Sequence, residues 1–265
     1  MPVPRPVTAA ASVLALTAAG LGAAGGTAQA ATTSYVALGD SYSSGVGAGD
    51  YDSGSGACKR SANAYPKLWN AAHDPGSFTF AACSGATTDT VKSDQLDALD
   101  SGTSLVSITV GGNDVGFSGV MSGCVTQSNA DCLSAIDDAE ARMDDDLPGA
   151  LGSLFTAIGG KAPSAHVVVL GYPHLYHISD SYCAGLSDAK RTALNGGADK
   201  LDSVIETAAH AHGFTFSDVR DEFSGHELCT GDDWLHSVAY PVDESYHPTA
   251  KGQKSGYLPA FTGAA

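Results

Sequence analysis

The sequence predicts an α/β fold in which a mainly parallel sheet of about five strands is covered by helices on both faces. Short β-rich runs that stop at Gly, Asp or Asn alternate along the chain with stretches of helical character. Such alternation favours parallel strands that are joined by helices. Three of the runs are almost entirely apolar, as expected for strands that are buried on both faces of a sheet.

The five expected strands are short, and each is followed by residues that end a strand. The strands cover residues 34–38, 78–82, 105–110, 166–170 and, more weakly, 214–217. The residues that end them are Gly39-Asp40-Ser41, Cys83-Ser84-Gly85, Gly111-Gly112-Asn113-Asp114, Gly171-Tyr172-Pro173 and Asp218. Open α/β sheets bind their ligands beside the carboxyl ends of the strands. A functional site is therefore expected at these breaks.

Helices are expected between the strands, at residues 63–70, 90–99, 131–158 and 187–212. The third of these has apolar residues near helical spacing, and we expect a break at Pro148. Ser187 or Asp188 is the expected N-cap of the fourth. Residues 31–265 contain no linker, internal repeat or low-complexity segment, so we expect them to form a single domain.

The composition excludes several functional classes. The chain of 265 residues has 13 Lys and Arg against 29 Asp and Glu, a net charge of −16. This acidity argues against a nucleic-acid partner, which would require a basic face. A hydrophobic content of 43% is too high for a disordered chain. After residue 30, no apolar run approaches the roughly 20 residues of a membrane-spanning helix, so no stable membrane anchor is expected.

Residues 1–30 have the pattern of a secretory signal peptide. Arg5 is the only charged residue, an Ala-rich apolar stretch covers about residues 7–21, and Ala28-Gln29-Ala30 fits the A-x-A cleavage pattern. The alternative is an apolar helix of the mature domain, which the glycines between residues 20 and 26 would weaken. Cleavage after Ala30 would leave a secreted protein of 235 residues with a net charge of −17. Such acidity favours solubility outside the cell, so lipid contact would have to be apolar.

The six cysteines all lie after residue 30, and an even number in an exported chain suggests three disulfides. Six cysteines allow 15 pairings, and the sequence alone does not choose among them. A zinc site is the rival interpretation, but the chain contains no C-x-x-C pair. The histidine pairs His174/His177 and His210/His212 lack an evident third ligand. We therefore expect no metal and no cofactor.

Four residues at the strand ends and in a late loop suit acyl transfer. Ser41 would present its hydroxyl at the carboxyl edge of the sheet, and Gly85 would let its N–H approach a substrate oxygen. The side-chain amide of Asn113 could donate to an oxyanion. Pro248 favours an extended conformation at His247, which places this candidate base on a loop. Each residue also has a structural interpretation, namely a helix N-cap, a turn glycine, a left-handed turn residue and an ordinary histidine.

The four candidate residues taken together are a more specific signal of function than any one of them alone. In chain order it reads Gly39-Asp40-Ser41, Gly85, Asn113-Asp114 and His247-Pro248. This resembles the SGNH (GDSL) hydrolases, whose four blocks carry Ser, Gly, Asn and His in that order. The longer strings at 39–45, 82–87, 110–114 and 245–249 resemble those of the secreted Streptomyces lipases and phospholipases A1, and the similarity covers essentially the whole mature chain.

The resemblance implies both an architecture and a set of roles. The fold would be a flavodoxin-like three-layer α/β/α sandwich. Ser41 would be the nucleophile and His247 the base. The oxyanion hole would consist of the N–H groups of Ser41 and Gly85 and the side chain of Asn113. The implied disulfides are Cys58–Cys83, Cys124–Cys132 and Cys183–Cys229.

The chain departs from the family pattern at two points. The first block reads Gly-Asp-Ser-Tyr instead of Gly-Asp-Ser-Leu, and Glu244 stands where an Asp usually precedes the histidine by three residues. In the Streptomyces relatives a main-chain carbonyl two residues before the histidine can orient it, which here belongs to Ser245. We favour the Ser245 carbonyl over Glu244, because Glu is one methylene longer than Asp.

The predicted function is the hydrolysis of carboxylic esters of lipids, as a lipase, esterase or phospholipase A1, by a secreted monomer. One alternative is a carbohydrate acetylesterase on the same framework. Another is a secreted binding protein that binds a ligand at the carboxyl ends of the strands without catalysing a reaction. A lipase of the α/β-hydrolase type is disfavoured, because the chain contains no G-x-S-x-G motif.

Overall fold

The computed structural model describes residues 1–4, 6, 32–178, 183 and 185–265. The expected signal peptide, residues 1–30, therefore lies outside the described residues apart from its first few positions. Thr32–Ala265 form one compact unit, which carries all the elements described below.

A five-stranded, fully parallel sheet forms the centre of this unit, in the order β2-β1-β3-β4-β5. The strands are β1 (Ser34–Gly39), β2 (Ser77–Phe80), β3 (Leu105–Thr109), β4 (His166–Leu170) and β5 (Thr215–Ser217). The three central strands are almost completely buried, and this explains their continuous apolar runs. The expected fold class is confirmed, and this strand order is the flavodoxin-like one.

Short and long helices connect the strands. The α-helices are α1 (Ser41–Ser44), α2 (Tyr65–His73), α3 (Thr88–Asp94), α4 (Phe117–Thr126), α5 (Asn129–Asp145), α6 (Leu147–Lys161), α7 (Asp188–Ala211), α8 (Arg220–Phe223), α9 (Ala250–Gly252) and α10 (Leu258–Ala264). Shorter 3₁₀ and π turns are η1 (Ser53–Cys58), η2 (Leu96–Ala98), η3 (Val242–Glu244) and η4 (Gln253–Tyr257).

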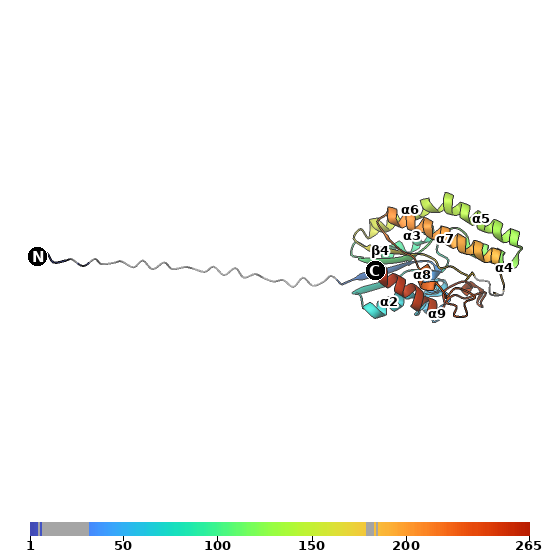
Figure 1. Cartoon of the computed structure of the whole chain (residues 1–265), viewed down its shortest axis with the longest axis horizontal. Coiled ribbons are helices and arrows are strands. Elements are labelled where there is room, and N and C mark those ends of the chain that lie inside the picture. Colours follow the sequence, from blue (N-terminus) through green and yellow to red (C-terminus); the bar gives the residue numbers. More distant parts are fainter. Residues whose placement is uncertain (5, 7–31, 179–182, 184) are drawn as a thin grey trace. The chain divides into compact units, whose positions relative to one another are not determined.

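The helices cover the two faces of the sheet in separate layers (Figure 1). On one face, α10 packs against β4 and β5 and also against α2, which contacts β2. On the other face, α7 packs against β4 and β5, and α6 packs between α7 and α3. Helix α5 lies against α7, α6 and α4. The molecule is therefore a three-layer sandwich with an added helical layer over α7.

The helices differ from the expected ones in three places. The break in the 131–158 stretch comes at Asp146, and Pro148 lies in the first turn of α6, where a proline has no hydrogen bond to lose. The helix expected over 90–99 is split into α3 and η2. Helix α4 was not expected, although Phe117, Val120, Met121 and Cys124 recur at helical spacing, because the run is short and contains two glycines, which are unfavourable in a helix. Ser187, one of the two residues expected as the N-cap of this helix, is the N-cap of α7.

The six cysteines form three disulfides, Cys58–Cys83, Cys124–Cys132 and Cys183–Cys229. This is the pairing that the family resemblance implies. Within the described residues, no helix combines the length and the apolar character of a membrane span. The same residues contain no group of three or more His, Cys, Asp or Glu side chains that could hold a metal ion.

Candidate active site

Ser41 stands at the carboxyl edge of the sheet, as the first residue of α1 after the end of β1. Gly39 makes this turn with a φ of +119°, and a Cβ there would lie 2.5 Å from the Thr109 carbonyl oxygen of β3. Only glycine therefore lets β1 turn this close to its neighbour. Asp40 is the N-cap, and its side chain accepts the Tyr42 N–H at 3.0 Å.

His247 meets Ser41 although 206 residues separate them in the chain. Its Nε2 lies 2.7 Å from the Ser41 Oγ. On the other side of the ring, Nδ1 lies 3.1 Å from the main-chain carbonyl oxygen of Ser245. A proton on Nδ1 can be donated to this carbonyl, which leaves the lone pair of Nε2 directed at the hydroxyl. The pair can therefore act as nucleophile and base.

The Glu244 carboxylate is hydrogen-bonded to Tyr51. Its Oε1 accepts the Tyr51 hydroxyl at 2.9 Å, and Tyr51 in turn accepts the Gly47 N–H at 2.8 Å. Among the hydrogen bonds of the described residues, none joins the Glu244 carboxylate to the imidazole of His247. Of the two groups weighed from the sequence, the structure therefore brings the Ser245 carbonyl to Nδ1.

The surroundings of His247 keep its imidazole neutral. Burial lowers the pKa of His247 to about 4, and the hydrogen bond to the Ser245 carbonyl opposes this shift only in part. A neutral imidazole is the form that can accept the proton of Ser41. The imidazole of this candidate base is therefore neutral over the neutral and mildly acidic range.

Gly85 and Asn113 are held together by a hydrogen bond between their turns. The Asn113 Nδ2 donates to the Ala86 carbonyl at 2.9 Å, which uses only one of its two N–H bonds. Gly85 has a φ of +77° in the adjoining turn. Among the described hydrogen bonds, none uses the N–H groups of Ser41 or Gly85. The Cys83 N–H donates to the Gly39 carbonyl at 2.9 Å, which holds the turn of Gly85 beside the turn of Ser41, so these groups are candidate donors to a developing oxyanion.

Asp40 ties the Ser41 turn to the neighbouring strands. Its buried carboxylate accepts the Thr109 hydroxyl at 2.6 Å and the Tyr172 hydroxyl at 2.5 Å. Burial raises the pKa of Asp40 to about 6, while these hydrogen bonds act in the opposite direction. The Tyr172 hydroxyl also accepts the Gly112 N–H at 3.3 Å. Tyr172 therefore bridges the turn that carries Ser41 and the turn that carries Asn113.

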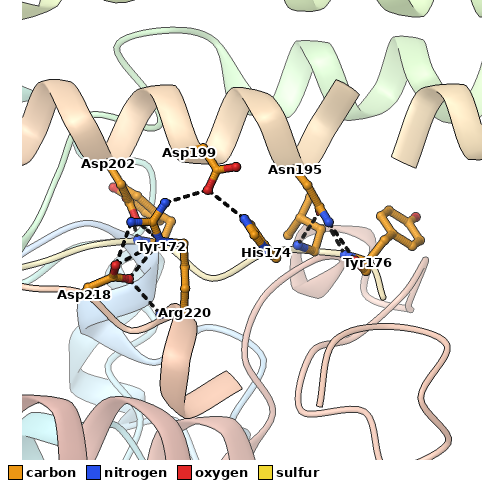
Figure 2. Close-up of polar contacts among 9 residues, drawn as sticks. Tyr172, His174, Tyr176, Asn195, Asp199, Asp202, Asp218 and Arg220 are labelled. Carbon is orange, nitrogen blue, oxygen red and sulfur yellow. Dashed lines mark hydrogen bonds and ion pairs between the residues drawn. The ribbon is translucent and has the colours of Figure 1, made fainter. Parts of the chain in front are cut away.

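Tyr172 is a positioning residue that the sequence analysis missed, since Gly171-Tyr172-Pro173 was interpreted only as the end of a strand. Its place at a strand end could have pointed to it. Figure 2 shows how helix α7 holds the segment that follows β4. The Asp202 Oδ1 accepts the Tyr172 N–H at 2.9 Å, and the Asn195 Nδ2 donates to the Tyr176 carbonyl at 2.7 Å. Helix α7 thus fixes the main chain at Tyr172, from which the side chain reaches Asp40.

A cavity with an almost entirely apolar lining opens beside Ser41 and Asn113. Helices α4, α5 and α7 build most of its wall. The large apolar residues that line it include Phe117, Val120, Ile136, Met143, Leu194 and Leu201. Sequence analysis did not predict this cavity, because three separate helices build it and one of them, α4, was not expected. A hydrocarbon chain attached to a carbonyl group at Ser41 can be buried there.

The sequence matches the model of the GDSL-like lipase/acylhydrolase family over residues 37–254. The chain belongs to this family. It is 58% identical to Lipase 1 of Streptomyces coelicolor over 96% of this chain and 95% of that protein. Family membership makes the chain a carboxylic ester hydrolase of the lipase type.

Two solved structures are also very similar. The crystal structure of a phospholipase A1 from Streptomyces albidoflavus has a TM-score of 0.87 and 54% sequence identity, and the match covers 89% of this chain and 100% of that one. The structure of an extracellular lipase from Streptomyces rimosus has a TM-score of 0.86 and 54% identity, with 88% and 100% coverage. The sequence comparison and the structural comparison therefore lead to the same family and the same fold.

Proposed function

We propose that this chain is a secreted enzyme that cleaves carboxylic esters of lipids through an acyl-enzyme on Ser41. The observation that carries the proposal is the 2.7 Å contact between the Ser41 Oγ and the His247 Nε2 at the mouth of the apolar cavity. Relatives that are named as lipases and as a phospholipase A1 support the same conclusion.

In the first step, the Ser41 Oγ attacks the ester carbonyl while His247 takes its proton at Nε2. The N–H groups of Ser41 and Gly85 and the amide of Asn113 hold the negative oxygen of the intermediate. The imidazolium then gives its proton to the leaving alcohol. Water repeats the sequence on the acyl-enzyme and releases the fatty acid. The Ser245 carbonyl keeps the imidazole in the required tautomer throughout.

The cavity favours long acyl groups over acetyl groups. Its wall is almost entirely apolar and includes side chains from three helices, so a two-carbon acetyl group would contact only a small part of it. Burial of each further methylene contributes about 0.8 kcal/mol. Lipid esters are therefore better substrates for this site than acetylated sugars, which is the alternative that the sequence left open.

Export is part of the proposal. Residues 1–30 are the expected signal peptide, and residues 31–265 are the expected mature single-domain enzyme. Three disulfides support a location in an oxidising compartment. The name of the Streptomyces rimosus relative, an extracellular lipase, points the same way.

A series of nitrophenyl esters from two to sixteen carbons tests the substrate class. We expect kcat/KM to be higher for acyl chains of eight or more carbons than for acetate. Ala198→Trp narrows the cavity, because Ala198 lines it from α7, and should reduce kcat/KM for the long esters by about tenfold relative to acetate.

Ala193→Trp is the matched control, since Ala193 lies on the same helix and is also half-buried but does not line the cavity. A preference for acetate would indicate an acetylesterase instead. The absence of turnover on every ester would indicate a binding protein.

A further inference from the structure

Three large apolar side chains are exposed within five residues of one loop. Val238, Tyr240 and Val242 are 59%, 98% and 73% exposed, and we call residues 238–242 the apolar loop. Elsewhere in the described part of the Thr32–Ala265 unit, only Val125 and Ile178 are large apolar residues with comparable exposure. Single exposed apolar residues are common, but a cluster of them marks an interaction surface.

The apolar loop leaves and rejoins the chain beside the candidate base. The His236 N–H donates to the His247 carbonyl at 2.9 Å, and the Tyr246 N–H donates to the His236 carbonyl at 2.9 Å. These two bonds close the base of the loop next to His247. Val242 precedes His247 by five residues, so the two Cα atoms are at most ~18 Å apart. The exposed side chains therefore lie near the active site.

Hydrogen bonds within its own segment and an ion pair with another part of the chain hold the loop in a defined conformation. The Ala239 N–H donates to the Ser245 Oγ at 2.9 Å, and the Glu244 N–H donates to the Pro241 carbonyl at 3.0 Å. Below it, Asp243 forms an ion pair with Lys59. The apolar side chains are thus displayed on an ordered support, so little conformational entropy is lost when they are buried.

The charges around the loop indicate what kind of surface it fits. The loop itself contains no charged residue, and both acidic groups that follow it are engaged, Asp243 with Lys59 and Glu244 with Tyr51. The chain as a whole has a net charge of −16. An anionic surface would be repelled, whereas an uncharged or zwitterionic lipid surface would accept the valines and the amphipathic tyrosine.

We propose that residues 238–242 dock the enzyme onto uncharged or zwitterionic lipid surfaces and so bring the Ser41–His247 site to aggregated substrate. This inference rests on the proposed function, because it assigns the loop to the delivery of a lipid ester. It concerns the interface and not the chemical step. Docking and turnover can therefore be measured separately.

Docking is tested with vesicles of dialkyl ether phosphatidylcholine, which contain no ester that the enzyme could cleave. We expect the full-length mature protein to sediment with these vesicles. Tyr240→Ser combined with Val242→Ser should lower the partition coefficient by about tenfold or more, since binding scales with buried apolar area. On a soluble short-chain nitrophenyl ester, kcat/KM of the same variant should stay within about twofold. Val125→Ser, which removes an exposed valine from α4, is the matched control and should change neither quantity.

A second variant, Tyr240→Trp, reports the contact directly, because its indole emission should shift to the blue when the vesicles are added. Unchanged partitioning of the double variant, an equal loss with Val125→Ser, or no binding by the wild type would overturn the proposal. Stronger binding after phosphatidylglycerol is added would also overturn it, because attraction would then be electrostatic. An equal loss of soluble-ester turnover in the double variant would show that the loop supports the site instead. Failure of the wild type to cleave any soluble ester would count against the proposed function, whatever the vesicles show.

Discussion

On one side of the Ser41–His247 contact, the nucleophile stands on a turn whose polar groups are buried and hydrogen-bonded. On the other side, the imidazole is carried by a segment that leads into the exposed apolar loop. Asp40 is 2% exposed and Thr109 is completely buried, whereas Tyr240 in the loop is 98% exposed. The two regions meet at the reacting groups through a hydrogen bond of 2.7 Å between the Ser41 Oγ and the His247 Nε2.

This difference separates two tasks. The buried side fixes the positions of the reacting hydroxyl and of the oxyanion donors, so a change there should alter kcat. The exposed side holds the imidazole only at its base, through the Ser245 carbonyl and through the Tyr42 hydroxyl, which donates to the Tyr246 carbonyl at 2.7 Å. Changes farther out on that side should leave the chemical step intact.

The largest effect is expected at Asn113, on the buried side. Asn113→Ala removes an oxyanion donor and should lower kcat by about 10²–10³ with little change in KM. Asn63→Ala is the control, because Asn63 also donates to a main-chain carbonyl, that of Ala48 at 2.9 Å, but does not line the cavity beside Ser41. Steady-state kinetics on a soluble ester measure both variants. A rise in KM at constant kcat would make Asn113 a binding residue instead.

A smaller effect is expected at Tyr172, which acts through Asp40 and Gly112. Tyr172→Phe leaves a buried carboxylate with one donor fewer, at a cost of about 1–3 kcal/mol in stability. We expect kcat to fall by about tenfold while KM changes little. Tyr35→Phe removes another buried hydroxyl, bonded to Ser107 at 2.7 Å in the sheet, and should share the stability loss without the loss in kcat. If both variants lose kcat equally, Tyr172 has only a structural role.

The smallest effect is expected at Glu244, on the exposed side. Glu244→Gln keeps an oxygen that can accept the Tyr51 hydroxyl, so kcat/KM should remain within about twofold of the wild type. Loss of the carboxylate that orients a catalytic histidine costs about 10⁴ in serine proteases. A loss of that size here would show that Glu244, and not the Ser245 carbonyl, orients His247. The exposed side would then also affect the chemical step.

Sequence reasoning located the elements that depend on local patterns. Ser41 and Asn113 could be placed because apolar strands stop at glycine-containing turns, and His247 could be placed on a loop because Pro248 follows it. The same strings carry the resemblance to the family, and that resemblance implies the flavodoxin-like architecture.

The remaining features depend on contacts between distant segments. The hydroxyl of Tyr172 reaches Asp40 across 132 positions of sequence, and although the place of Tyr172 at a strand end is a signal, no local pattern identifies Asp40 as its partner. Helix α4 has apolar residues at helical spacing, but its two glycines weaken the helix signal, and its place in the cavity wall depends on tertiary packing. The exposure of Tyr240 is likewise not evident from the sequence, because Pro241 indicates a loop or an edge strand but does not say which side chains face solvent.

The most direct test of the Ser41–His247 pair is the rate at which a fluorophosphonate labels the protein between pH 3.5 and 8. The label should be found on Ser41 by mass spectrometry and should be absent from Ser41→Ala. Because burial lowers the pKa of His247 to about 4, the imidazole stays neutral as the pH falls, and the labelling rate should decline only near pH 4.

Circular dichroism must accompany each point of this measurement. An unfolded histidine takes up its proton near pH 6.5, so protonation favours the unfolded chain increasingly from there down to pH 4. Labelling at Ser41 with a midpoint near pH 4, in protein that is still folded, is the predicted result. Labelling at another residue, or a midpoint near 6.5 in folded protein, would contradict the account of a nucleophile activated by a buried, neutral His247.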